Sequence, residues 1–200
     1  MTEIAYRWSG TLLVVGAALL GVAIVIVSLK PVMDQPLSPG ASLLMLLSAL
    51  CLLLSLPAMY FRQADAAGWL GLAGFMLLQA GILILVVLAA TPILYPSLKN
   101  PAGENLVVFL LGIVFTLGLL LTGLASLRAG VFPRGAGILL LAAMAGFFFD
   151  FFVAEFLPPV TGQVGSAIFG ILLALSLAWY GVSLWTGNLG PVVGNAVPAP

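Results

Sequence analysis

Residues 69–91 read WLGLAGFMLLQAGILILVVLAAT, a stretch in which no side chain carries a charge. It exceeds the ~20 residues that an α-helix needs to cross the ~30 Å hydrocarbon core of a bilayer. Similar apolar runs of about this length lie on both sides of it, at 12–29, 42–61, 106–127, 137–157 and 167–185. Together these runs predict six membrane-spanning segments.

The composition of the whole chain supports this prediction. Of its 200 residues, 63% are hydrophobic and 6% are charged, and the mean hydropathy is +1.28. About a quarter of the residues of a soluble domain are charged. Because lipid cannot hydrogen-bond the backbone, spanning segments must be helices or closed barrels, and these continuous runs lack the alternation of barrel strands. We therefore expect an all-α fold, a polytopic transmembrane helical bundle.

The connections between the runs are short, which favours antiparallel packing of sequence neighbours. We expect residues 1–186 to form a single six-helix transmembrane domain. The remaining segment, 187–200, is rich in proline and glycine and is expected to be a non-helical C-terminal tail.

A weak internal repeat runs along the chain. The stretch from Arg62 to Gly71 aligns with that from Arg128 to Gly137, with equal spacing between the arginine and the last glycine. This repeat indicates three consecutive helical hairpins, as in some transporters built from tandem repeats. Chance similarity explains it equally well in so apolar a chain.

The basic residues predict the orientation. If the helices alternate in direction, one side holds Arg7, Arg62, Arg128 and Arg134, and the other holds Lys30 and Lys99. By the positive-inside rule the arginine side is cytoplasmic, so both termini face inward in the plasma membrane. The tryptophans at 8, 69, 179 and 185 also fall toward this side. The alternative is one re-entrant run, which would place the termini on opposite sides.

Several classes of chemistry are disfavoured by what the chain lacks. It has no histidine, the commonest metal ligand and general base, and its lone cysteine is Cys51. No phosphate-binding glycine loop, metal-binding pair or basic nucleic-acid patch is present. We expect no metal, no cofactor, no nucleic-acid partner and no enzymatic activity.

The polar residues inside the runs are the candidate site. Asp150 is the ionisable residue deepest within a run, and intramembrane acids are usually functional or paired. Gln79 and Thr116 are the expected hydrogen-bonding partners of its carboxyl group. The functional hypothesis is a protonatable intramembrane site, and the alternative is a neutral carboxyl that joins two helices.

Small residues at four-residue spacing predict where helices approach one another, since they allow close contact between backbones in lipid. The predicted helix-packing residues are Gly146 and Ala142, then Gly170, Ala174 and Ala178, and finally Gly118 and Thr122.

Two functions remain open on these grounds. The first is a membrane protein without a catalytic site that acts by packing, either as an accessory subunit of a membrane complex or as a self-associating bundle. Its partners would be membrane lipids and other membrane subunits or further copies of the chain. The alternative is a small proton-coupled transporter or channel-like protein that uses Asp150.

Overall fold

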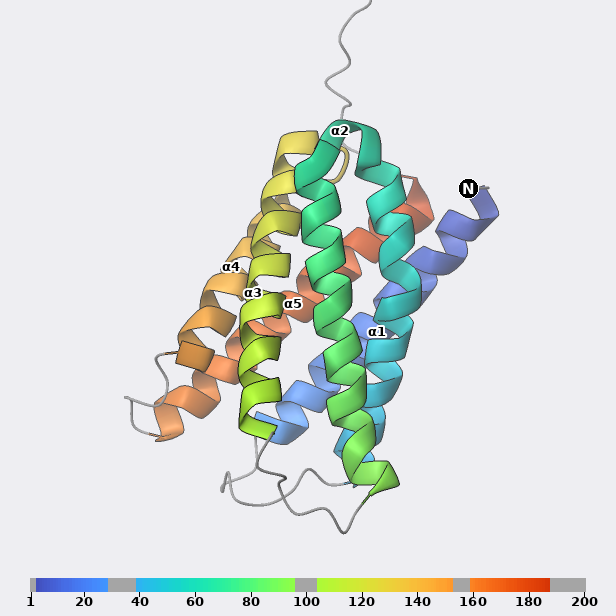
Figure 1. Cartoon of the computed structure of the whole chain (residues 1–200). Helices are drawn as coiled ribbons and strands as arrows, with labels where there is room; N and C mark the ends of the chain where they lie inside the picture. Colours follow the sequence, from blue (N-terminus) through green and yellow to red (C-terminus); the bar gives the residue numbers. More distant parts are fainter. Residues whose placement is uncertain (1–2, 29–38, 96–103, 153–158, 188–200) are drawn as a thin grey trace, which may run out of the picture.

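The computed structural model describes residues 3–28, 39–95, 104–152 and 159–187. All the regular secondary structure of this described part is helical and it contains no strand, so the prediction of an all-α fold is confirmed. Its helices are α1 (Glu3–Ser28), α2 (Pro39–Leu94), α3 (Glu104–Ala129), α4 (Arg134–Phe152) and α5 (Pro159–Thr186) (Figure 1).

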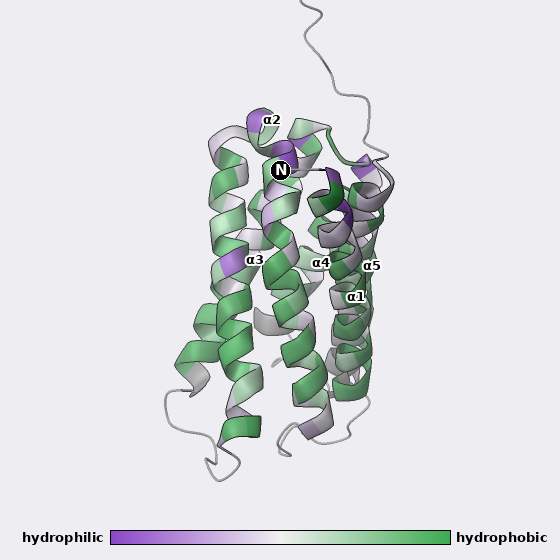
Figure 2. Ribbon diagram, turned by 90° about the vertical axis from the view of Figure 1, so that its right-hand side faces the viewer, coloured by the Kyte–Doolittle hydropathy of each residue, from purple (hydrophilic) through white to green (hydrophobic). Residues whose placement is uncertain are grey.

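Four of the described helices are long and apolar enough to cross a membrane. The qualifying stretches are Glu3–Val27, Pro39–Leu94, Leu106–Ala129 and Ala167–Thr186. The apolar stretch of α4, Arg134–Phe149, is shorter. These lengths support the prediction of a membrane protein with transmembrane helices. Figure 2 shows hydrophobic residues along the length of the helices.

The described part has five helices where the sequence predicted six spans. The runs 42–61 and 69–91 lie in one element, α2, which bends sharply at Gly68. Gly68 has φ +57° and ψ −149°, a conformation that residues with a Cβ rarely adopt. Because this one residue redirects the chain, the predicted loop at 62–68 is absent and helix continues to position 67. The two limbs of α2, 39–67 and 69–94, lie side by side (Figure 1).

Contacts between the limbs of α2 show how closely they pack. The Gln79 side-chain amide donates a hydrogen bond to the Leu53 carbonyl oxygen at 3.0 Å. The rings of Tyr60 and Phe75 stack with their centroids 4.8 Å apart. The α2 element is therefore a helical hairpin.

Helix ends also differ from the predicted runs. Helix α1 begins at Glu3 and α5 at Pro159, earlier than the apolar runs that begin at 12 and 167. Hydropathy marks where hydrocarbon contact starts, whereas helical hydrogen bonding continues through polar turns. The end of the run 137–157 and nearly all of the predicted tail, from position 188 onward, lie outside the described residues.

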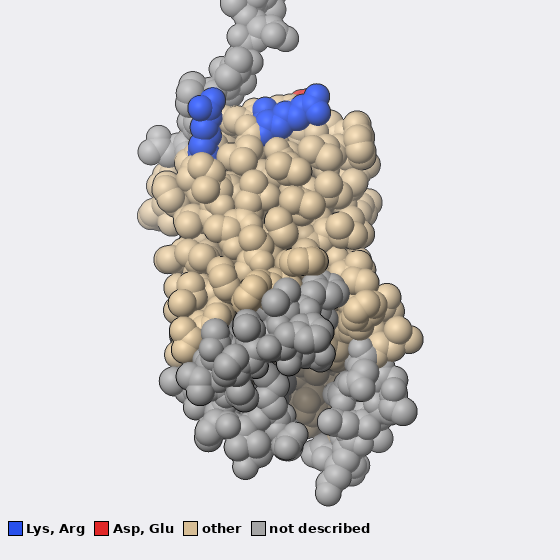
Figure 3. Space-filling model, turned by 90° about the vertical axis from the view of Figure 1, so that its left-hand side faces the viewer, with Lys and Arg blue, Asp and Glu red and all other residues tan. Residues whose placement is uncertain are grey.

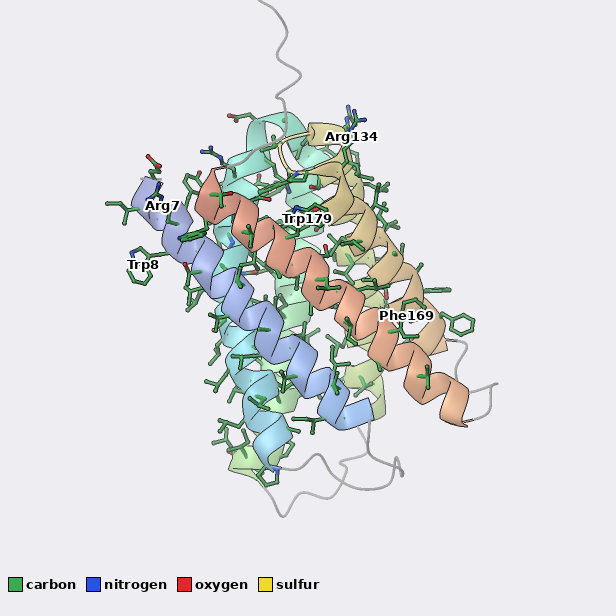
Figure 4. All side chains as sticks on the ribbon, turned by 180° about the vertical axis from the view of Figure 1, so that it is seen from behind. Arg7, Trp8, Arg134, Phe169 and Trp179 are labelled. Atoms are coloured by element: carbon green, nitrogen blue, oxygen red, sulfur yellow. The ribbon has the colours of Figure 1, made fainter. Side chains whose placement is uncertain are left out.

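The helices pack in a ring. Each helix contacts its neighbours in sequence, and α5 returns to pack against α1. Figure 4 shows α1 and α5 side by side across one face of the bundle. The buried core includes leucines from every part of the ring, such as Leu13, Leu52, Leu119, Leu140 and Leu177. With five helices in the described part, the three consecutive helical hairpins that the sequence repeat indicated are not supported.

The connection from α3 to α4 is short and partly buried. Gly130, with φ +64°, ends α3, and its amide donates to the Ser126 carbonyl at 3.1 Å. Phe132 then turns inward and meets the ring of Tyr180 edge to face, with centroids 5.0 Å apart. This connection therefore fixes α5 against α3 and α4.

All four arginines lie at one end of the bundle, which we call the arginine end. Arg7 and Arg134 are seen there in Figure 4, and the Arg62 guanidinium lies over the Tyr6 ring at 5.1 Å. Arg128 is at the end of α3, next to the turn that leads to Arg134. Figure 3 shows basic side chains at this end of the visible face.

Candidate functional site

The three predicted polar residues lie on three helices. Gln79 is in the second limb of α2, Thr116 is in α3 and Asp150 is in α4, where its side chain is outside the described part of the structure. Gln79 uses its amide nitrogen to hold Leu53 of the opposite limb. Thr116 is buried, and its hydroxyl has no hydrogen-bond partner among the described residues. No hydrogen bond joins Gln79 to Thr116 in the described structure.

Other buried polar side chains connect helices. The Ser48 hydroxyl donates to the Gly16 carbonyl at 2.8 Å, and the Ser176 hydroxyl donates to the Ala136 carbonyl at 2.9 Å. The Tyr180 hydroxyl donates to the Ser126 hydroxyl oxygen at 2.8 Å. With the bond from Gln79, these contacts join α1 to α2, the two limbs of α2, α3 to α5 and α4 to α5.

Gly118 and Thr122 lie where α3 meets the second limb of α2. A Cβ at Gly118 would be 2.6 Å from the backbone nitrogen of Leu78. A Cβ at Gly74 of α2 would be 2.6 Å from the backbone nitrogen of Thr122. At both points a helix backbone occupies the space that a side chain would need, so the two helices are in backbone contact.

The predicted packing residues of α4 and α5 lie against different neighbours. Gly170 packs on Ile24, and Ala174 faces Gly21, both on α1. A Cβ at Gly146 of α4 would fall within the ring of Phe169 of α5, which Figure 4 shows where the two helices meet. Ala142 and Ala178 are half-buried.

A pocket of about 450 Å³ opens at the arginine end. Its lining comes from three helices and the residue that follows the last of them: Glu3, Tyr6 and Arg7 of α1, Arg62 of α2, Ser183, Leu184 and Trp185 of α5, and Gly187. Sequence reasoning placed Arg7 and Arg62 on one side but missed this pocket. The positive-inside pattern was the available signal, and only the packing of α1 and α5 beside the bend of α2 brings the two arginines together.

A second hollow, of about 490 Å³, is an open apolar groove between α1 and α5. It is lined by residues between Val14 and Ile26 of α1 and between Ile171 and Ala178 of α5. Its small residues include Gly21 and Ala174, at which the two helices come close. We refer to it as the α1–α5 groove.

Within the described residues, no three Cys, Asp or Glu side chains come together as a metal site. No protein-family model, curated protein or solved structure matches this chain.

Proposed function

We propose that this protein is a non-catalytic, multi-pass protein of the plasma membrane that acts by packing, as an accessory subunit or as a self-associating bundle. The observation that carries this proposal is a set of four polar side chains that join helices within the bundle. The side chains of Ser48, Gln79, Ser176 and Tyr180 each form a hydrogen bond to another helix or limb. Such bonds strengthen helix association in lipid, where the hydrophobic effect does not drive it.

The proposed topology has six crossings with both termini in the cytoplasm. Each limb of α2 contains an apolar run long enough to span, namely 42–61 and 69–91, and the bend at Gly68 lies between them. We count the limbs as two crossings and α4 as the fifth. The gathering of four arginines at one end supports a cytoplasmic arginine end.

Cysteine labelling tests this topology. In a Cys51→Ala background, we expect Tyr95→Cys to react with an impermeant maleimide in intact cells, because position 95 ends the second limb on the outer side. Asp65→Cys, near the bend, should react only after the cells are permeabilised. Tyr95 and Asp65 are both exposed in the structure, so a difference in labelling reports the side of the membrane and not burial within the protein. Labelling of both cysteines from the same side would contradict two crossings by α2.

Crosslinking in native membranes tests the packing function. Single cysteines at exposed, membrane-facing positions of each helix or limb would be oxidised in the same Cys51→Ala background. Suitable positions are Val22, Leu54, Leu83, Leu117, Ile138 and Leu175. We expect crosslinks confined to one or two adjacent positions, either to a second copy, at twice the 20.7 kDa of one chain, or to a distinct membrane protein.

The six positions are controls for one another, because random collisions in the membrane would crosslink all of them to similar extents. A stable association face gives an uneven pattern. Equal crosslinking at all six positions, or none at any of them together with a lone monomer after gentle purification, would disprove the proposed packing function.

A further inference from the structure

We propose that the arginine-end pocket binds the phosphate headgroup of an anionic phospholipid whose acyl chain lies in the α1–α5 groove. This goes beyond general solvation by lipid, because it assigns one lipid molecule to one built site. The proposal rests on the composition of the pocket, on the way Arg62 is held, and on the alignment of pocket and groove along the same helix pair.

The pocket contains the donors that a phosphate group requires. Arg7 and Arg62 reach it from different helices, and the side chain of Tyr6 lines it as well. An arginine guanidinium forms paired, charge-assisted hydrogen bonds to phosphate oxygens. Two arginines against Glu3 leave the lining with a net charge of +1. The pocket therefore suits a singly charged phosphodiester.

Arg62 is pre-positioned for this role. Its guanidinium carbon lies over the Tyr6 ring, 5.1 Å from the ring centre, in a cation–π contact that holds the side chain beside the pocket. Arg7 is paired with Glu3 at 3.5 Å, but both side chains are largely exposed, at 61% and 83%. Exposed pairs of this kind contribute little to stability, so a phosphate group can replace Glu3 as the partner of Arg7.

The surroundings of the pocket are those of a membrane interface. Trp8 is 68% exposed and lies beside Arg7 at the arginine end (Figure 4), and Trp185, which lines the pocket, is 56% exposed. Exposed tryptophans concentrate at the level of lipid headgroups. Basic pockets between helices at this level are suited to anionic headgroups. Because the pocket lies at the level of the headgroups, the anion closest to it is a lipid phosphate.

The α1–α5 groove lies on the same helix pair as the pocket, but the two share no lining residue. Between them α1 and α5 are in backbone contact, since a Cβ at Gly10 would be 2.6 Å from the Gly181 carbonyl oxygen. An acyl chain that reaches the groove from the pocket therefore passes over this contact. Positions 7, 14, 18, 21 and 25 of α1 recur at helical spacing, so Arg7 lies on the face of α1 that lines the groove. From Val14 to Ile26 the groove covers about 18 Å at ~1.5 Å per residue. One leaflet of hydrocarbon is about 15 Å deep. The groove is therefore long enough for an acyl chain.

The experiment measures lipid binding by the full-length purified protein. Native mass spectrometry and thermal unfolding would be recorded with dioleoyl phosphatidylglycerol, with dioleoyl phosphatidylcholine and with inorganic phosphate. We expect one phosphatidylglycerol to bind tightly and to raise the melting temperature, and the other two additives to have little effect. In the double variant R7Q/R62Q we expect the affinity for phosphatidylglycerol to fall by on the order of tenfold or more, because two charge-assisted contacts are lost.

Two further variants sharpen the test. Arg134→Gln removes an exposed charge at the same end but outside the pocket, and should leave binding unchanged. Ala18→Phe places a ring at an exposed groove position and should weaken lipid binding without altering either arginine. Melting in the absence of lipid shows whether each variant is folded.

Three results would each overturn the proposal. One is wild-type affinity in both R7Q/R62Q and Ala18→Phe. Another is an equal loss in Arg134→Gln, which would show a general charge effect. The third is stabilisation by inorganic phosphate equal to that by phosphatidylglycerol, which would indicate a site for soluble anions. This test does not measure crosslinking to protein partners. The lipid-binding proposal can therefore fail while the proposed packing function holds, and the reverse.

Discussion

Replacing Tyr180 with alanine is expected to cause the largest loss of stability among substitutions in α5. Tyr180 is completely buried, its hydroxyl donates to Ser126 of α3, and its ring packs against Phe132. Removing a buried aromatic ring costs about 3–5 kcal/mol, since a cavity is left behind. The free energy of unfolding, measured by titration with denaturing detergent in mixed micelles, should fall by about this amount.

Two other substitutions are controls for this prediction. Tyr180→Phe keeps the ring and removes only the hydroxyl, so we expect a loss of about 1 kcal/mol. Leu175→Ala lies on the same helix, but Leu175 is 54% exposed, and lipid or detergent can fill the space. The proposed role of Tyr180 would be refuted if Tyr180→Ala were no more destabilising than Leu175→Ala.

Replacing Gly118 with leucine is expected to disrupt the contact between α3 and the second limb of α2. A Cβ at this position would meet the Leu78 backbone nitrogen at 2.6 Å and its Cα at 2.8 Å. Backbone atoms of a packed helix cannot move aside as a flexible side chain can, so the helices must separate. Overpacking typically costs about 1–3 kcal/mol, and clashes with backbone lie at or beyond the upper limit.

Gly165 is the matched control for Gly118. It also lies within a helix, and the nearest atom to a Cβ there is a ring carbon of Phe169 at 4.0 Å. Alanine is favoured over glycine by about 1 kcal/mol inside a helix. We therefore expect Gly165→Ala to maintain or raise the melting temperature and Gly118→Ala to lower it. The same direction of change at both sites would argue against a tight backbone contact at Gly118.

The helical nature of the fold could be predicted from composition because lipid leaves the backbone few alternatives. Runs such as 69–91 are uncharged and long, and helices appear there. Helix bounds were less predictable: α1 and α5 extend into polar turns, where hydropathy no longer marks the helix. The bend within α2 was also missed, because glycines are frequent in this chain and no local pattern distinguishes Gly68 from Gly71 or Gly74.

The candidate site could be predicted only in part from the sequence. Gln79 was recognised as a polar group that needs a partner, but its bond to Leu53 depends on the angle at which the α2 limbs meet. The burial of Tyr180 could not be predicted from the sequence, because a tyrosine near the end of an apolar run is usually interfacial. Its burial follows from the inward turn of Phe132 between α3 and α4.

The sequence by itself determined that the described part of this chain is built of helices, that most of them are long and apolar enough to cross a membrane, and that the arginines favour one end. These properties depend on each residue's own preference for lipid or water and can be summed along the chain. Only the tertiary structure decided which residues face one another: that α5 returns to α1, that Arg7 and Arg62 share a pocket, and that Gly118 meets the backbone of Leu78. Such pairings are selected by shape, since lipid solvates every apolar helix face almost equally well and hydrophobicity alone does not favour one pairing over another.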